Sequence, residues 1–194
     1  MQTEQRASRQ RVLAVTFLIA LMMPTVAVTD ASAGHAIAAE SQVAWRAHLA
    51  KVADAVDKAD MPGAVLHWRD AYAAALRSRH WEGLVAVGDA YRRLGDRGGF
   101  KEVAAAKART IYLAALFRAR QEASLDGVLR AAQAFADLGD AVVVAQCLKL
   151  ARPLAAETRD ARADQRLHVF AARWEARRLE IEHRNELGRG ESVQ

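Results

Sequence analysis

The stretch WEGLVAVGDAYRRLGD, from Trp81 to Asp96, returns 44 residues later as LDGVLRAAQAFADLGD, from Leu125 to Asp140. Both copies end in Leu-Gly-Asp, and an aromatic residue stands four positions before the glycine in each. Apolar residues recur at spacings of three and four, which marks one face of an α-helix. These residues are Leu84, Val87, Tyr91 and Leu94 in the first copy, and Val128, Ala131, Phe135 and Leu138 in the second.

The ends of the two copies predict how the chain continues. Gly95 and Gly139 can adopt the left-handed conformation that ends many helices. Asp96 and Asp140 follow at once, and aspartate is a favourable N-cap for the next helix. Each copy therefore predicts a helix, a tight Gly-Asp turn and a second helix. One such hairpin cannot bury both of its faces, so we expect neighbouring hairpins to stack.

The pattern resembles the tetratricopeptide repeat (TPR), whose first helix carries W-x2-L-G-x2-Y and whose second helix carries A-x3-F or Y. The resemblance covers residues 45–155 and implies an all-α, TPR-like α-solenoid of about three hairpins. The matching residues of the middle repeat are Leu84, Val87, Gly88, Tyr91, Gly95, Asp96, Ala108, Tyr112, Ala115 and Leu116. Those of the later repeat are Val128, Ala131, Ala132, Ala134, Phe135, Gly139, Asp140, Val144, Leu148 and Ala151. An earlier, more divergent copy carries Trp68, Tyr72, Ala75 and Leu76 in its second helix, and residues 45–60 would be its first helix.

The middle repeat departs from the family pattern. It is about ten residues longer than the usual 34, with the excess in RGGFKEVAAAKA after Asp96. Either its second helix is longer, or Gly98 and Gly99 form an elbow before Phe100. A Sel1-like or another helical-hairpin repeat is the alternative to a true TPR. Gly88, inside a predicted helix, indicates a close crossing of two helices, because glycine there otherwise costs about 1 kcal/mol relative to alanine.

A last helix is predicted over residues 156–188, with Thr158 as its cap and residues 189–194 as a disordered tail. Its apolar residues lie on one stripe of a densely charged helix, as a terminal capping helix requires. A two-stranded coiled coil or a basic helix on a membrane surface is the alternative. The stripe consists of Leu167, Phe170, Trp174 and Ile181.

The first 33 residues are typical of a signal peptide. A basic segment with Arg6, Arg9 and Arg11 precedes the apolar run VLAVTFLIALMM, and small residues follow at Ala31 and Ala33. We expect cleavage after Ala33, a flexible lead-in over residues 34–44, and a periplasmic or secreted protein. The alternative is an uncleaved inner-membrane anchor formed by residues 12–28, and membrane contact is expected only in that case.

The sequence offers little for catalysis. It contains no HExxH, P-loop, GxGxxG or GxSxG motif, and the single cysteine, Cys147, can form neither an intrachain disulfide nor a cysteine zinc cluster. We therefore expect no enzyme activity, no cofactor and no bound metal. The net charge of +5 and the clusters Arg92, Arg93, Arg97 and Arg118, Arg120 permit nucleic-acid binding. An exported protein with three repeats does not favour it, and we expect no nucleic-acid partner.

The resemblance implies a non-catalytic adaptor or scaffold in the bacterial cell envelope that binds a protein or a peptide. In the TPR family the first helices of successive repeats line a concave groove. The residues of this chain at groove-facing positions are Val85, Asp89, Arg92, Arg93, Leu129, Gln133 and Asp137. Arg92 and Arg93 would bind carboxylates, because the guanidinium group offers a rigid fork of donors. The alternative is structural self-assembly, with homo-oligomers formed through the C-terminal helix, or a membrane-tethered scaffold.

Overall fold

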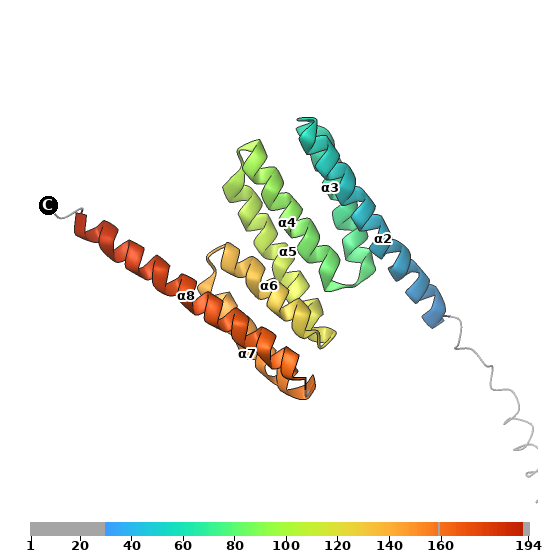
Figure 1. Cartoon of the computed structure of the whole chain (residues 1–194). Helices are drawn as coiled ribbons and strands as arrows, with labels where there is room; N and C mark the ends of the chain where they lie inside the picture. The colour runs from blue at the N-terminus through green and yellow to red at the C-terminus, as the bar shows by residue number, and fades with distance from the viewer. Residues whose placement is uncertain (1–29, 159, 192–194) are drawn as a thin grey trace, which may run out of the picture. The chain divides into compact units, whose positions relative to one another are not determined.

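The structure is a computed structural model that describes residues 30–158 and 160–191. This part of the chain contains seven α-helices and no strand, so the predicted all-α class is confirmed (Figure 1). The described residues from 36 onward form one compact unit. The helices are α2 (Asp30–Asp57), α3 (Met61–Ser78), α4 (Trp81–Gly98), α5 (Lys101–Gln121), α6 (Leu125–Asp137), α7 (Ala141–Thr158) and α8 (Ala161–Glu191).

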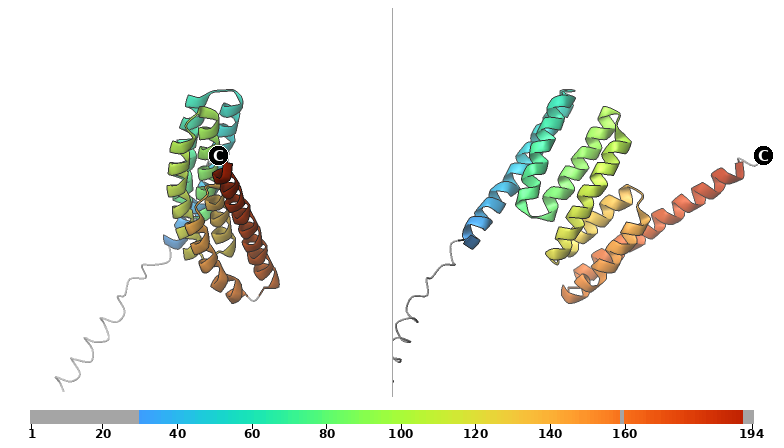
Figure 2. Two further views of the ribbon diagram at one scale, coloured as in Figure 1. Left: turned by 90° about the vertical axis from the view of Figure 1, so that its left-hand side faces the viewer. Right: turned by 180° about the vertical axis from the view of Figure 1, so that it is seen from behind.

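The helices stack as successive hairpins. From α3 to α8, each helix packs against the next one along the chain, and α4 also contacts α6, as α6 contacts α8 (Figure 2). A contact between every second helix is the arrangement of a helical solenoid, in which the first helices of neighbouring hairpins share a layer. The even-numbered helices α4, α6 and α8 form that layer.

The doubled stretch forms α4 and α6, and its predicted apolar face is the core. Leu84, Val87 and Leu94 are fully buried, as are Val128 and Phe135 in the second copy. Burial of each large apolar side chain contributes about 1.5–3 kcal/mol to stability. Trp68 of the preceding hairpin extends this core, because its indole packs 4.2 Å from the Tyr91 ring and donates a 2.8 Å hydrogen bond to the Val87 carbonyl.

The two copies turn differently. In the second copy Gly139 has φ +75°, as predicted, and the Asp140 backbone carbonyl accepts from the first turn of α7. The Asp140 carboxylate does not cap α7, because it accepts from Arg109 of α5 at 2.6 and 2.9 Å. In the first copy the predicted turn at Gly95–Asp96 is wrong, because α4 continues to Gly98 and Gly99 takes the left-handed conformation with φ +76°. Gly95 serves a close crossing instead, since a Cβ there would lie 2.2 Å from the Cβ of Ala104 on α5. The extra residues therefore lengthen α4 by a turn and give α5 its 21 residues.

Side chains cap the N-terminal ends of α6 and α8. The Ser124 hydroxyl accepts from the Gly127 N–H at 3.1 Å and caps α6, as its position indicates. Thr158 does not cap the last helix, because it is the final residue of α7 and its hydroxyl donates to the Ala155 carbonyl. The carboxylate of Asp160 accepts from the Arg162 N–H at 2.9 Å and caps α8 instead.

The ends of the described chain differ from the predicted boundaries. Residues 34–44, expected to be a flexible lead-in, belong to α2. The last helix begins at Ala161 rather than residue 156 and runs to Glu191, past the expected end at 188. The alternative anchor at residues 12–28 and the first 29 of the 33 residues of the predicted signal peptide lie outside the described residues, and residues 30–33 belong to α2. Within residues 30–158 and 160–191, no helix is long and apolar enough to cross a membrane.

Candidate functional site: a cleft between α2 and α4

The terminal helix α8 covers the last hairpin. Leu167 and Trp174 are buried, and Phe170 is half-buried against the core. Two ion pairs join α8 to α6, Arg166–Asp126 at 2.8 Å and Arg177–Asp137 at 3.1 Å. Phe170 and Trp174, which the sequence also offers as a self-assembly surface, are therefore already packed within one chain. The side chain of Ile181 lies outside the described residues.

Two of the predicted groove residues, Val85 and Asp89, serve the packing of α4. Val85 is buried in the core. The Asp89 carboxylate accepts a 2.7 Å hydrogen bond from the Tyr112 hydroxyl and forms an ion pair with Arg130 of α6. Burial is the main cause that raises the pKa of Tyr112, and the negative charge of Asp89 raises it further. The phenol therefore stays protonated and donates to Asp89, which ties α4 to α5 and α6.

Four more predicted groove residues lie where α4, α6 and α8 meet. Arg92 donates to the backbone carbonyl of Asp137 at 3.3 Å. The Asp137 carboxylate accepts from Gln133 at 2.8 Å and from Arg177 of α8 at 3.1 Å. Leu129 is half-buried against the core. Arg92 therefore already has an acceptor at this boundary, where a mostly polar cavity of about 510 Å³ lies beside Arg92, Asp137 and the start of α5.

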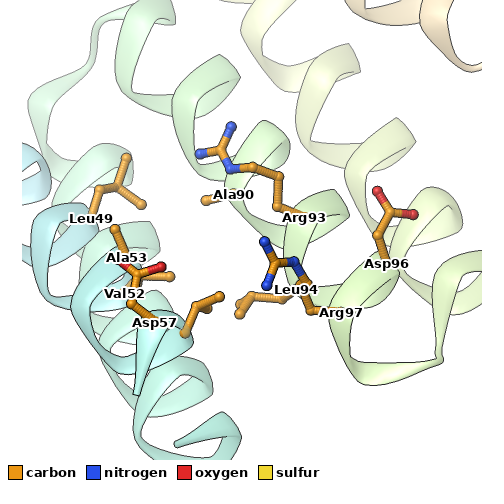
Figure 3. Close-up of a pocket in the computed structure, with 10 residues that line it drawn as sticks. Leu49, Val52, Ala53, Asp57, Ala90, Arg93, Leu94, Asp96 and Arg97 are labelled. Atoms are coloured by element: carbon orange, nitrogen blue, oxygen red, sulfur yellow. The ribbon is translucent and has the colours of Figure 1, made fainter. Parts of the chain in front are cut away.

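Arg93 lines a different surface. A cleft of about 310 Å³ lies between α2 and α4, and Figure 3 shows its walls. At the start of α4 the two helices are in contact, because a Cβ at Gly83 would lie 3.0 Å from Nε1 of Trp45 on α2. Further along, the cleft separates them. Its lining residues are Leu49, Val52, Ala53, Val56 and Asp57 of α2, and Ala90, Arg93, Leu94, Asp96 and Arg97 of α4.

The cleft has apolar walls and two cationic side chains. Ala90 and Leu94 of α4 are buried behind it, and Leu49, Val52 and Val56 form the α2 wall. Arg93 and Arg97 are exposed, and neither forms a hydrogen bond or an ion pair within the described part of the chain. Both guanidinium groups are directed toward the α2 side in Figure 3.

The sequence pattern identified one residue of this cleft, Arg93, and missed the rest. The sequence pattern marks Arg97 only as a member of a basic cluster, not as a residue of the groove. The α2 wall follows a helical spacing of three and four from Leu49 to Val56, which is a detectable signal. The family pattern places a neighbouring helix against such a stripe, so the pattern cannot show that a space remains between α2 and α4.

The second basic cluster has a structural role at Arg118. Its guanidinium donates to the carbonyls of Ala75 and Leu76, both at 3.1 Å, at the C-terminal end of α3. Desolvation by burial lowers the pKa of Arg118. Arg118 therefore satisfies carbonyls that the end of α3 leaves without helical partners, and it is not available to a phosphate.

Within residues 30–158 and 160–191, no group of three or more His, Cys, Asp or Glu side chains is placed to hold a metal ion. Cys147 is fully buried, and burial raises the pKa of its thiol to about 11. The thiol is therefore protonated and shielded at neutral pH, which makes it a poor nucleophile.

The described part of the chain is a stack of α-helical hairpins with an open cleft between α2 and α4. Comparison with protein-family models, with curated proteins and with solved structures finds no match to this chain.

Proposed function

We propose that this protein is a non-catalytic adaptor of the bacterial cell envelope that binds a segment of a partner protein in the cleft between α2 and α4. One observation carries the proposal: apolar side chains line an open cleft beside two arginines that have no partner in the described chain. Apolar surface in a concave site favours binding, because its removal from water contributes about 25 cal/mol per Å².

The resemblance to TPR proteins supports the same function. The contacts within the chain move the proposed site from the α4–α6 boundary to the α2–α4 boundary. The first helices of the hairpins here are α2, α4 and α6, and a groove would run across them. Internal hydrogen bonds occupy the α4–α6 boundary through Arg92 and Asp137. The α2–α4 boundary combines apolar walls with two arginines that no described residue binds, so it is the better candidate for the binding site.

The envelope location rests on the predicted signal peptide at residues 1–33. Export would place residues 34–194 in the periplasm or outside the cell. Retention of residues 12–28 as an anchor would place the same cleft at the inner membrane. The intact mass of the protein recovered from the envelope distinguishes the two, because cleavage after Ala33 removes the anchor.

Site-specific photocrosslinking tests the proposed function. A photoreactive amino acid replaces Ala53, an exposed residue of the cleft wall, or Ala114, an exposed residue on α5 away from the cleft. We expect irradiation of cells to attach a defined partner at position 53 and not at position 114. Mass spectrometry of the crosslinked peptide identifies the partner segment. The same products at both positions, or none at position 53, would contradict the proposal.

A further inference from the structure

We propose that the cleft selects a short extended segment in which apolar side chains flank one internal acidic residue, whose carboxylate binds between Arg93 and Arg97. This inference rests on the proposed function and adds the chemistry of the partner. The size of the cleft, the spacing of the two arginines and the position of the acidic side chains around them support it.

The size of the cleft favours an extended segment over a helix. Its α2 wall runs from Leu49 to Asp57, which corresponds to about 12 Å along a helix axis. A helix is about 10 Å in diameter, so a single extended chain, which is narrower, enters a cleft of about 310 Å³ more readily. An extended chain at about 3.3 Å per residue spans the wall with three or four residues.

The apolar part of the cleft faces the flanking side chains of that segment. Val52 is buried, Leu49 and Val56 are half-buried, and Leu94 closes the α4 side. In an extended chain alternate side chains point to the same side. One apolar residue on each side of the acidic residue would then point the opposite way. These two side chains would cover the apolar walls while the carboxylate points toward the arginines.

The two arginines are spaced for one carboxylate. Arg93 and Arg97 are four positions apart on α4, which brings their Cβ atoms to about 5–6 Å. Two cations at that distance repel each other, and an anion between them removes the repulsion. Arginine is suited to this contact because its planar fork binds carboxylate oxygens in pairs.

The acidic side chains of the cleft limit how much negative charge the partner can carry. Asp57 lies on the α2 wall and Asp96 on α4, and no ion pair links either one to Arg93 or Arg97 within the described residues. Figure 3 shows Asp96 on the side of the arginines away from α2, and Asp57 on the opposite wall. Asp57 would repel a second carboxylate at its end of the cleft, so a single acidic residue fits better than an acidic run.

Fluorescence anisotropy with short peptides tests the inference. The probe is acetyl-Gly-Leu-Glu-Leu-Gly-amide with a fluorophore on a neutral linker, and its analogues carry Gln or Lys in place of Glu. Both peptide ends are capped, so the central side chain is the only charged group of the peptide. We expect the full-length protein to bind the Glu peptide at least about tenfold more tightly than the Gln peptide, as charge-assisted hydrogen bonds require.

Charge reversal supplies the second measurement. We expect Arg93→Glu/Arg97→Glu to lose the preference for Glu and to bind the Lys peptide best. The matched control is Arg120→Glu/Arg152→Glu, which makes the same change of charge at exposed positions on α5 and α7 and should retain the preference for Glu. If circular dichroism shows that the reversed variant is unfolded, Arg93→Gln/Arg97→Gln replaces it, with loss of the preference as the expected result.

Failure of this inference differs from failure of the proposed function. Equal binding of the Glu and Gln peptides by the wild-type protein, unchanged in the Arg93/Arg97 variants, would overturn the acidic selectivity and leave crosslinking at Ala53 intact. Absence of peptide binding up to millimolar concentration would also overturn it. Absence of a crosslinked partner at Ala53 is the outcome that removes the proposed function itself.

Discussion

Single residues set the closest approach between helices in this fold, and Gly88 is the clearest case. A Cβ at this position would lie 2.4 Å from Cε1 of Tyr112, well inside van der Waals contact. The Tyr112 hydroxyl in turn donates to Asp89. The sequence predicts a close crossing at Gly88, and the structure confirms it and identifies the ring that makes it necessary.

We expect Gly88→Ala to lower the free energy of unfolding by about 1–3 kcal/mol, because the added methyl group displaces the Tyr112 ring. The cost of this overpacking exceeds the gain in helix propensity from glycine to alanine. Urea unfolding followed by circular dichroism measures the change. In a Tyr112→Leu background, which removes the ring, the same substitution should cost much less. An equal cost in both backgrounds would show that crowding against Tyr112 is not the cause.

The buried thiol of Cys147 gives a pH-dependent prediction. Its pKa is raised from 9.0 to about 11, so the folded state disfavours the thiolate. The stabilisation is complete below pH 9 and is lost as pH rises toward 11. Between pH 9 and 11 we expect the free energy of unfolding to fall more steeply in the wild type than in Cys147→Ala. The difference between the two slopes is at most about 1.4 kcal/mol per pH unit. Identical slopes for the two proteins between pH 9 and 11 would contradict the burial of the thiol.

At the scale of helices, Arg118 connects α5 to the end of α3. We expect Arg118→Met to destabilise the protein by roughly 1–3 kcal/mol, because the carbonyls of Ala75 and Leu76 lose a charged donor in a partly buried place. Thermal unfolding and hydrogen exchange near the end of α3 measure the effect. Arg120→Met, an exposed arginine on the same helix, should change stability by less than about 0.5 kcal/mol. Equal effects of the two substitutions would be evidence against the cap.

The terminal helix α8 is a second test at this scale. We expect Trp174→Ala to cost about 3 kcal/mol or more, since the side chain is 9% exposed and covers α6. Leu179→Ala on the same helix should cost little, because Leu179 is 55% exposed. Equilibrium unfolding in urea, with size-exclusion chromatography of each variant, separates loss of stability from a change of oligomeric state. A dimer that Trp174→Ala dissociates without loss of monomer stability would support self-assembly through this helix instead.

Helix periodicity in the sequence predicted the core faces of α4 and α6, because the same apolar spacing that marks a helix also marks the side that it buries. It placed one turn correctly at Gly139 and the other wrongly at Gly95. A glycine can serve a turn or a close crossing, and only the partner atom, here the Cβ of Ala104, decides between them. The cap at Asp160 was missed for a related reason, since Thr158 and Asp160 are both favourable cap residues two positions apart.

At the scale of the whole described unit, the sequence predicted the order of the hairpins better than the location of the site. Repeat positions specify which residues face a neighbouring helix, and they assigned the groove to α4 and α6. The contacts of Asp89, Arg92 and Asp137 show that this surface is used for internal bonding. The open cleft depends on the separation of α2 from α4, a distance between helices that a periodic pattern does not encode.

The cleft joins the first hairpin to the rest of the stack, so its occupancy is coupled to unfolding. A ligand that contacts both α2 and α4 binds the folded state and not the unfolded chain. By mass action it raises the free energy of unfolding by about 2.7 kcal/mol at a concentration one hundred times its dissociation constant. The melting temperature of the unlabelled protein is therefore a direct readout of occupancy. Candidate partners can be ranked by the melting temperatures of their complexes at equal concentration.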